Sequence, residues 1–247
     1  MSTQFNMPTE TVELPSKGLL YPAGSPLASG SIEMKYMTAK EEDILTNQNY
    51  IEKGIVVDKL LESLIVTKVN YSDILIGDKD ALLIASRILG YGKDYTFTVY
   101  GEEITVDLTT LSNKELDQSL LHEEGKNEFT YKLPTTDNTI TFKLLTQKDE
   151  KEIQRELEGL KKISATTSAE ISTRMKHMIL SVNGNYERPY VRSFVDNGFL
   201  ARDARAFREY YGKIVPGINT TINHTFEDGL EEELTIPINA NFLWPDF

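Results

Sequence analysis

The sequence predicts an α+β fold with a mainly helical core, three β-hairpins and an extended N-terminal arm. Several segments carry apolar residues three and four apart, and three pairs of segments alternate apolar and polar residues around short turns. Because helices separate the hairpins, the order is not that of a doubly wound parallel sheet. The 247 residues, 40% of them hydrophobic, are enough to bury a core without a disulfide or a metal.

The expected organisation is an arm over 1–37, a helical region with two hairpins over 38–145, and a helical region with a final hairpin and aromatic tail over 146–247. The last two regions are alternatively one continuous domain. Four prolines and three glycines interrupt the arm, and proline disfavours helix at its own position and at the residue before it. Because such an arm is ordered only when it lies on another surface, we assign its apolar Leu14 and Tyr21 to partner binding.

Three helices are expected early in the chain: one from 38 to about 47 or 49, one over 55–66 and one over 79–89. Thr38 and Glu41 match a capping box. The segment 55–66 has a wide apolar stripe that favours a buried helix, although its β-branched residues leave a strand as the alternative. Asp78 is placed as an N-cap, and Gly90 as the glycine that follows the last helical residue.

The three hairpins are expected at about 95–108, 129–145 and 221–238. Turn residues such as Gly101 and Asp228-Gly229 separate their alternating strands. A short helix over 113–121 is expected between the first two hairpins. Longer amphipathic helices are expected over 146–163, 169–182 and 199–211, with a break at 164–168.

Composition excludes several classes of function. With 38 acidic and 26 basic residues, the formal net charge is −12, so the chain has no global attraction to nucleic acid or to an anionic membrane. The absence of cysteine excludes disulfides, zinc–thiolate sites and a cysteine nucleophile. The start of the chain lacks the pattern of a signal peptide, and no apolar run approaches about 20 residues. We expect an intracellular protein.

The sequence contains no motif of a P-loop, a dinucleotide-binding fold, a serine hydrolase or a zinc protease. We therefore expect no catalytic residue, no cofactor and no metal. His177 is expected to be solvated, and His122 and His224 to be structural. The alternative from a different class is a hydrolase or transferase whose site combines scattered carboxylates with His122 or His224.

Arginine placement is the first feature that points to a function. Six of the eight arginines lie between 174 and 208. In the expected helix 199–211, Leu200 lies on the apolar face, Arg202 and Arg205 point away from that face, and Arg208 lies at its flank. Arginine is enriched at protein interfaces, so this surface is a candidate docking face. The alternatives are a solvated face paired with the chain's own acids, and a nucleic-acid-binding module.

The aromatic ending is the second such feature. Phe242, Leu243, Trp244 and Phe247 lie within the last six residues, whereas chain ends are normally polar. The tail either docks on its own domain or inserts into a partner. For the second case, Phe242 and Trp244 are the candidate contacts.

Short motifs along nearly the whole chain resemble the T4-type bacteriophage baseplate hub and hub-assembly proteins. These motifs are Leu14-Pro15-Ser16-Lys17-Gly18 with Tyr21, Thr38-Ala39-Lys40-Glu41-Glu42, Phe194-Val195-Asp196-Asn197 with Asp203, Pro216-Gly217-Ile218, and Phe242-Leu243-Trp244-Pro245. Some members of that family carry cysteine pairs in hairpins that resemble zinc ribbons. The turns at Val99-Tyr100-Gly101 and Phe226-Glu227-Asp228-Gly229 have no thiols, which implies that this member has lost the metal.

The resemblance implies a non-enzymatic role in building the central hub of a contractile tail. The chain would be an assembly factor or, alternatively, a permanent subunit of the virion baseplate. Its partners would be other baseplate hub or tail proteins, not nucleic acid and not a membrane. Its location would be the host cell cytoplasm during infection, or the virion baseplate in the alternative case.

Overall fold

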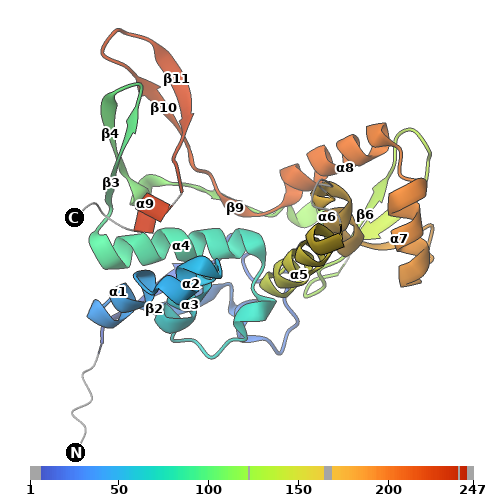
Figure 1. Cartoon of the computed structure of the whole chain (residues 1–247), viewed down its shortest axis with the longest axis horizontal. Helices are drawn as coiled ribbons and strands as arrows, with labels where there is room; N and C mark the ends of the chain where they lie inside the picture. Colours follow the sequence, from blue (N-terminus) through green and yellow to red (C-terminus); the bar gives the residue numbers. More distant parts are fainter. Residues whose placement is uncertain (1–6, 122, 164–168, 239, 244–247) are drawn as a thin grey trace, which may run out of the picture.

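In the computed structural model, helices and small antiparallel sheets form an α+β fold with two lobes (Figure 1). The structure describes residues 7–121, 123–163, 169–238 and 240–243. The chain builds most of the first lobe, passes into the second lobe, and returns to the first lobe for its last hairpin. The second lobe is therefore inserted into the first.

Two short strands cross between the lobes as an antiparallel pair, β5 (Asn113–Lys114) and β9 (Gly217–Ile218). The prediction of a helix over 113–121 is therefore wrong. After β5 comes only a 3-10 turn, Gln118–Leu120, where the Asp117 carboxylate accepts a hydrogen bond from the Ser119 N–H at 2.9 Å. Strand pairing with a segment about 100 residues away overrides the local helical pattern.

The helices of the first lobe are α1 (Ala39–Leu45), α2 (Gln48–Glu52), α3 (Val56–Leu64) and α4 (Ile76–Tyr91). The first predicted helix ends at Leu45, before its predicted end near Asn47 or Asn49, because the Asn47 side chain caps a second helix by accepting from the Tyr50 N–H. The helical interpretation of 55–66 is confirmed, and Leu60, Leu61 and Leu64 are fully buried.

Helix α4 begins before and ends after its predicted bounds. Leu75 is its N-cap, so the placement of Asp78 as a cap is wrong, and Asp78 instead lies buried in the first turn. Gly90 is helical, and Gly92 follows the last residue with a φ of 89°. Only glycine adopts that backbone conformation at no steric cost, which explains why the helix ends there.

The segment expected as an extended arm is folded over its described part. Strand β1 (Thr9–Glu13) pairs antiparallel with β2 (Ser31–Lys35), and the turn Pro26–Ser29 lies between them. A Cβ atom at Gly18 would lie 2.6 Å from the Ala28 carbonyl oxygen, so the loop can fold back tightly only with glycine there. The loop buries its apolar side chains in the core of the first lobe, and the arm is corrected to a hairpin.

Two hairpins stand side by side on the first lobe and form what we call the prong (Figure 1). They are β3 (Asp94–Val99) with β4 (Glu102–Asp107), and β10 (Thr221–Thr225) with β11 (Glu231–Thr235). At the base of the prong, α9 (Ala240–Leu243) places the Phe242 ring 4.9 Å from the Tyr95 ring, edge to face.

The second lobe has a three-stranded antiparallel sheet of β6 (Phe129–Lys132), β7 (Thr139–Phe142) and β8 (Ile179–Val182). Its helices are α5 (Gln147–Ile163), α6 (Glu170–Met178), α7 (Arg188–Asn197) and α8 (Ala201–Ile214). The predicted helix 169–182 ends at Met178, since the residues after it pair with β7. The β7–β8 pairing joins a strand of the predicted region 38–145 to a strand of the predicted region 146–247. Helix α7 was not predicted, and the predicted break at 164–168 lies outside the described residues.

The capping box of α1 is also a buried ionic site. Burial raises the pKa of the Glu41 carboxyl, but hydrogen bonds from Lys35, Thr38 and Ser63 outweigh burial and lower this pKa to about 2. A carboxylate with a lowered pKa stabilises the fold above its ordinary value of 4.5 and loses this contribution as the pH falls toward 2.

We therefore expect Glu41→Gln to lower the free energy of unfolding by about 1–3 kcal/mol at neutral pH. The deficit should shrink steadily below pH 4.5. Urea unfolding of both proteins over a pH series measures it, with the exposed Glu52→Gln as the matched control. A deficit that does not change with pH would show that the charge on Glu41 contributes nothing.

None of the described helices is both long and apolar enough to span a membrane.

Candidate functional site

Three residues that the sequence assigned to partner binding lie inside the fold. Leu14, Tyr21 and Phe242 are all buried, so none of them offers a surface to a partner in this structure. For Phe242 and Leu243 the structure shows the first of the two alternatives, in which the tail packs on its own lobe. Trp244 lies outside the described residues.

Tyr21 belongs to a buried polar cluster at the start of α4. The Asp78 carboxylate accepts hydrogen bonds from the Tyr21 hydroxyl at 2.6 Å, from the Ser16 hydroxyl at 2.7 Å and from the Ser16 N–H at 2.9 Å. The Tyr21 oxygen in turn accepts from the Leu75 N–H at 2.9 Å. Burial raises the pKa of Asp78, although these hydrogen bonds oppose the shift. The cluster attaches the 14–21 loop to α4 and is structural.

Helix α8 is held so that one face points outward. Asp203 is buried and accepts hydrogen bonds from the Thr135 N–H at 2.7 Å and from the Thr136 hydroxyl at 2.8 Å, which attaches α8 to the β6–β7 turn. Ala204 and Phe207 are buried on the same side. Because a helix repeats every 3.6 residues, positions 202, 205 and 208 lie on other sides of α8 than this buried side, and all three are exposed.

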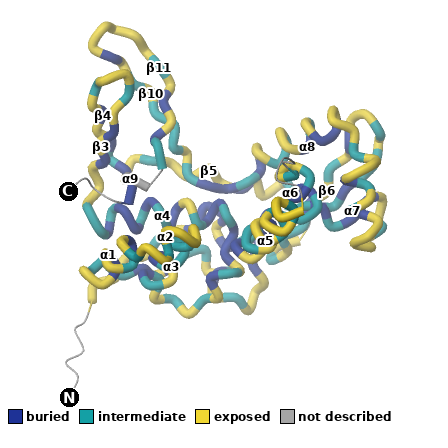
Figure 2. Tube along the Cα trace, in the orientation of Figure 1, coloured by how far each residue is buried: buried dark blue, intermediate teal, exposed yellow. Residues whose placement is uncertain are grey.

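The outward side of α8 carries Arg202, Arg205 and Arg208, which we call the arginine face. All three are exposed, which the sequence predicted for Arg202 and Arg205, whereas it placed Arg208 at the flank of the apolar face. Exposed residues run along α8 in Figure 2. Leu200, which the sequence placed on the apolar face, is 48% exposed, because it is the N-cap and precedes the first turn.

The charges of the arginine face are only partly compensated: Glu209 of the same helix lies near Arg205 and Arg208, which both lower the pKa of its carboxyl. Arg205 pairs with Glu209 of its own helix at 2.8 Å. Among the described residues, no acidic side chain lies within ion-pair distance of Arg202 or Arg208, whereas Arg174 and Arg192 each bind a glutamate. The alternative in which the whole face is paired with the chain's own acids therefore does not hold for Arg202 and Arg208.

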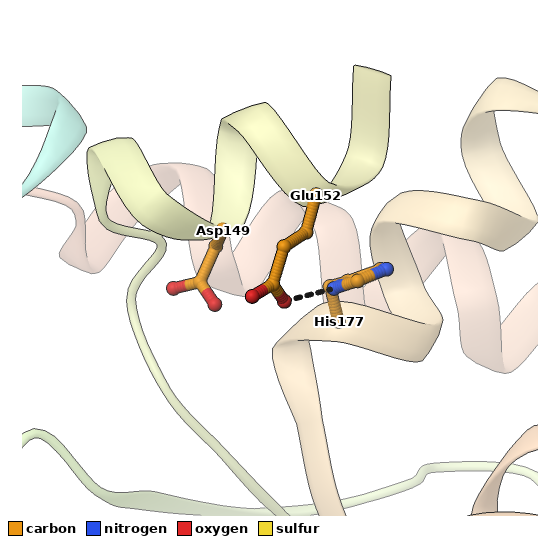
Figure 3. Close-up of side chains that lie close together, drawn as sticks. All are labelled: Asp149, Glu152 and His177. Atoms are coloured by element: carbon orange, nitrogen blue, oxygen red, sulfur yellow. Dashed lines mark ion pairs between the residues drawn. The ribbon is translucent and has the colours of Figure 1, made fainter. Parts of the chain in front are cut away.

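A second group of polar residues lies between α5 and α6, where Asp149, Glu152 and His177 approach one another (Figure 3). The side chain of His177 is only 10% exposed, so the prediction of a solvated histidine is wrong. Its Nε2 lies 3.2 Å from a Glu156 oxygen and its Nδ1 lies 3.9 Å from a Glu152 oxygen. The acidic face of α5 draws the ring inward.

The arrangement fits an ion-pair network better than a metal centre. One Asp149 oxygen lies 2.6 Å from the Lys143 ammonium, and the other accepts hydrogen bonds from Thr146. Arg192 binds Glu156 and, together with His177, lowers the pKa of that carboxyl. A cation at this point would have to displace Lys143 from Asp149. These contacts connect α5 to α6 and α7.

The structure also shows the position of His224, one of the two histidines that the alternative hydrolase or transferase would use. His224 lies in β10, where its Nε2 is 2.9 Å from Glu102 of β4, so it joins the two hairpins of the prong. A hollow of about 470 Å³ between the first lobe and the start of α5 is lined by Tyr21, Asp73 and Lys126 among others, and contains neither His177 nor His224. His122 lies outside the described residues.

Sequence reasoning missed one charged surface. Segment 94–107 has four acidic residues and segment 221–236 has five, and neither has a lysine or an arginine. Only the tertiary structure places the two segments together as the prong. The signal in the sequence was the absence of basic residues from both hairpins.

Comparisons with known proteins add no relative: no protein-family model, no curated protein and no solved structure matches this chain.

Proposed function

We propose that this chain is a non-enzymatic protein of bacteriophage tail assembly that helps to build the central hub of a T4-type baseplate. The resemblance of its short motifs supports the family. The observation that carries the mechanism is the arginine face of α8, where Arg202 and Arg208 are exposed and have no ion-pair partner among the described residues, in a protein of net charge −12.

The chemistry of this face defines the kind of partner. Guanidinium groups bind carboxylates through paired, parallel hydrogen bonds, and arginine is favoured at protein interfaces. The partner surface is therefore acidic, and we propose that it belongs to a baseplate hub or tail protein in the host cell cytoplasm. If the chain is instead a permanent virion subunit, its peptides will be detected by mass spectrometry of purified virions.

Two other functions have less support. A nucleic acid would meet only a short basic strip on a strongly acidic chain, and each phosphate contact is weakened by repulsion from the rest. The alternative hydrolase or transferase, as the sequence suggests it, needs a histidine and a carboxylate that face a cavity. His177 and His224 are instead each held by glutamates.

We expect Arg202→Glu/Arg205→Glu to leave the fold intact and to weaken capture of the hub partner at least tenfold. Both side chains are exposed, so the free energy of unfolding should change by no more than about 0.5 kcal/mol. The measurement is capture of tail proteins from infected cells by the tagged full-length chain, quantified by mass spectrometry.

The matched control is Lys148→Glu/Arg155→Glu on α5, which makes the same change in net charge at two other exposed positions. If the α8 variant retains the same hub proteins as the wild type, the arginine face has no docking role. If both double variants lose them equally, net charge and not the face controls binding.

A further inference from the structure

We infer that the arginine face of one copy binds the end of the prong of a second copy, so that the chain associates head to tail. This inference rests on the docking role proposed for α8 and adds a second copy of this chain to the acidic partners that the face recognises. The end of the prong comprises residues 100–103 and 226–233, which we call the acidic tip.

The acidic tip is a built surface in which each hairpin holds the other. Tyr100 and Gly101 form the β3–β4 turn with φ of 51° and 90°. The Tyr100 and Phe226 rings lie 5.7 Å apart, and Glu102 accepts a hydrogen bond from the Glu227 N–H at 3.2 Å. Groups already held in place lose little conformational freedom on binding, which favours association.

The tip exposes the groups that an arginine surface binds. Tyr100 is 81% exposed and Leu230 is 54% exposed. The tip also carries five exposed acidic residues: Glu103, Glu227, Asp228, Glu231 and Glu233. Among the described residues, none of these five has an ion-pair partner. Carboxylates can form ion pairs with guanidinium groups, and a guanidinium group can stack over the face of the Tyr100 ring in a cation–π contact.

The two surfaces belong to different lobes of one copy. The prong rises from the first lobe, whereas α8 lies in the second lobe, beyond the β9 crossing (Figure 1). Two identical surfaces brought together would oppose arginine with arginine, or acid with acid. The complementary contact is therefore between different surfaces of two copies, and such a contact repeats to give a ring or a filament.

The experiment compares two full-length variants by sedimentation velocity at low salt. The face variant is Arg202→Glu/Arg205→Glu/Arg208→Glu, and the tip variant is Glu227→Lys/Asp228→Lys/Glu231→Lys. We expect wild type to associate with rising concentration, and raised salt to weaken this association because exposed charges are screened. Each variant alone should associate at least tenfold more weakly.

An equimolar mixture of the two variants should associate again, although each variant alone associates only weakly. The normal arginine face of the tip variant meets the normal tip of the face variant, and the reversed face of the face variant meets the reversed tip of the tip variant, so both contacts in the mixture are complementary. A chain with all six changes should associate again, because both charges are reversed together. Misfolded variants would not restore association in either test, which makes these results a control for folding.

The inference is overturned if wild type stays monomeric at low salt, if either variant associates like wild type, or if the mixture stays monomeric. Its failure differs from that of the proposed function. A monomeric wild type whose Arg202→Glu/Arg205→Glu variant still loses the hub protein would leave the docking role of α8 standing with a different partner surface.

Discussion

Replacing Gly77 with alanine is expected to destabilise the fold by about 3 kcal/mol or more. Gly77 lies in the first turn of α4, where the segment leading into β9 crosses it. A Cβ atom there would lie 1.8 Å from the Pro216 carbonyl oxygen and 2.8 Å from its carbon. Both are backbone atoms, so the helix or the connection between the lobes has to move.

The matched control is Gly159→Ala in α5, where a Cβ atom would meet nothing within 4 Å. Alanine is the better helix former, so this change should stabilise by about 0.5–1 kcal/mol. Urea unfolding of both variants gives the two values with opposite signs. A Gly77→Ala protein as stable as wild type would mean that Pro216 does not pack on α4 as described.

The second large effect is expected for Asp78→Ala, which should cost about 3 kcal/mol or more. The change leaves the Ser16 hydroxyl, the Ser16 N–H and the Tyr21 hydroxyl without their acceptor in a buried place. The exposed Asp43→Ala is the control and should change stability by no more than about 0.5 kcal/mol. Equal losses in the two variants would contradict a buried role for Asp78.

Asp78→Asn tests the charge separately from the hydrogen bonds. Because burial raises the folded-state pKa of Asp78, its contribution to stability is greatest below its ordinary value of 3.8 and decreases as the pH rises through the folded-state pKa. Asparagine does not titrate, so the deficit of this variant relative to wild type should shrink as the pH rises. Urea unfolding from acid to neutral pH measures this, and a deficit that grows with pH would contradict the raised pKa.

Interactions between near neighbours in the chain were predictable. The capping box of Thr38 with Glu41 and the glycine turn of the β3–β4 hairpin involve residues one to three positions apart, so their geometry is contained in a short stretch of sequence. The outward placement of Arg202 and Arg205 follows from helical periodicity alone. The sequence by itself thus determined most helices, the hairpin turns and the arginine face.

Interactions over long separations were decided by the tertiary structure. The pairing of β5 with β9 and of β8 with β7 turned predicted helix into strand. Asp78 matched the local pattern of an N-cap, but its donors are Ser16 and Tyr21, 62 and 57 residues away. Likewise, the acidic tip exists only because two hairpins far apart in the chain pack together. A local pattern contains no information about such distant partners, and burying backbone polar groups and apolar surface against them outweighs the small energies of local propensity.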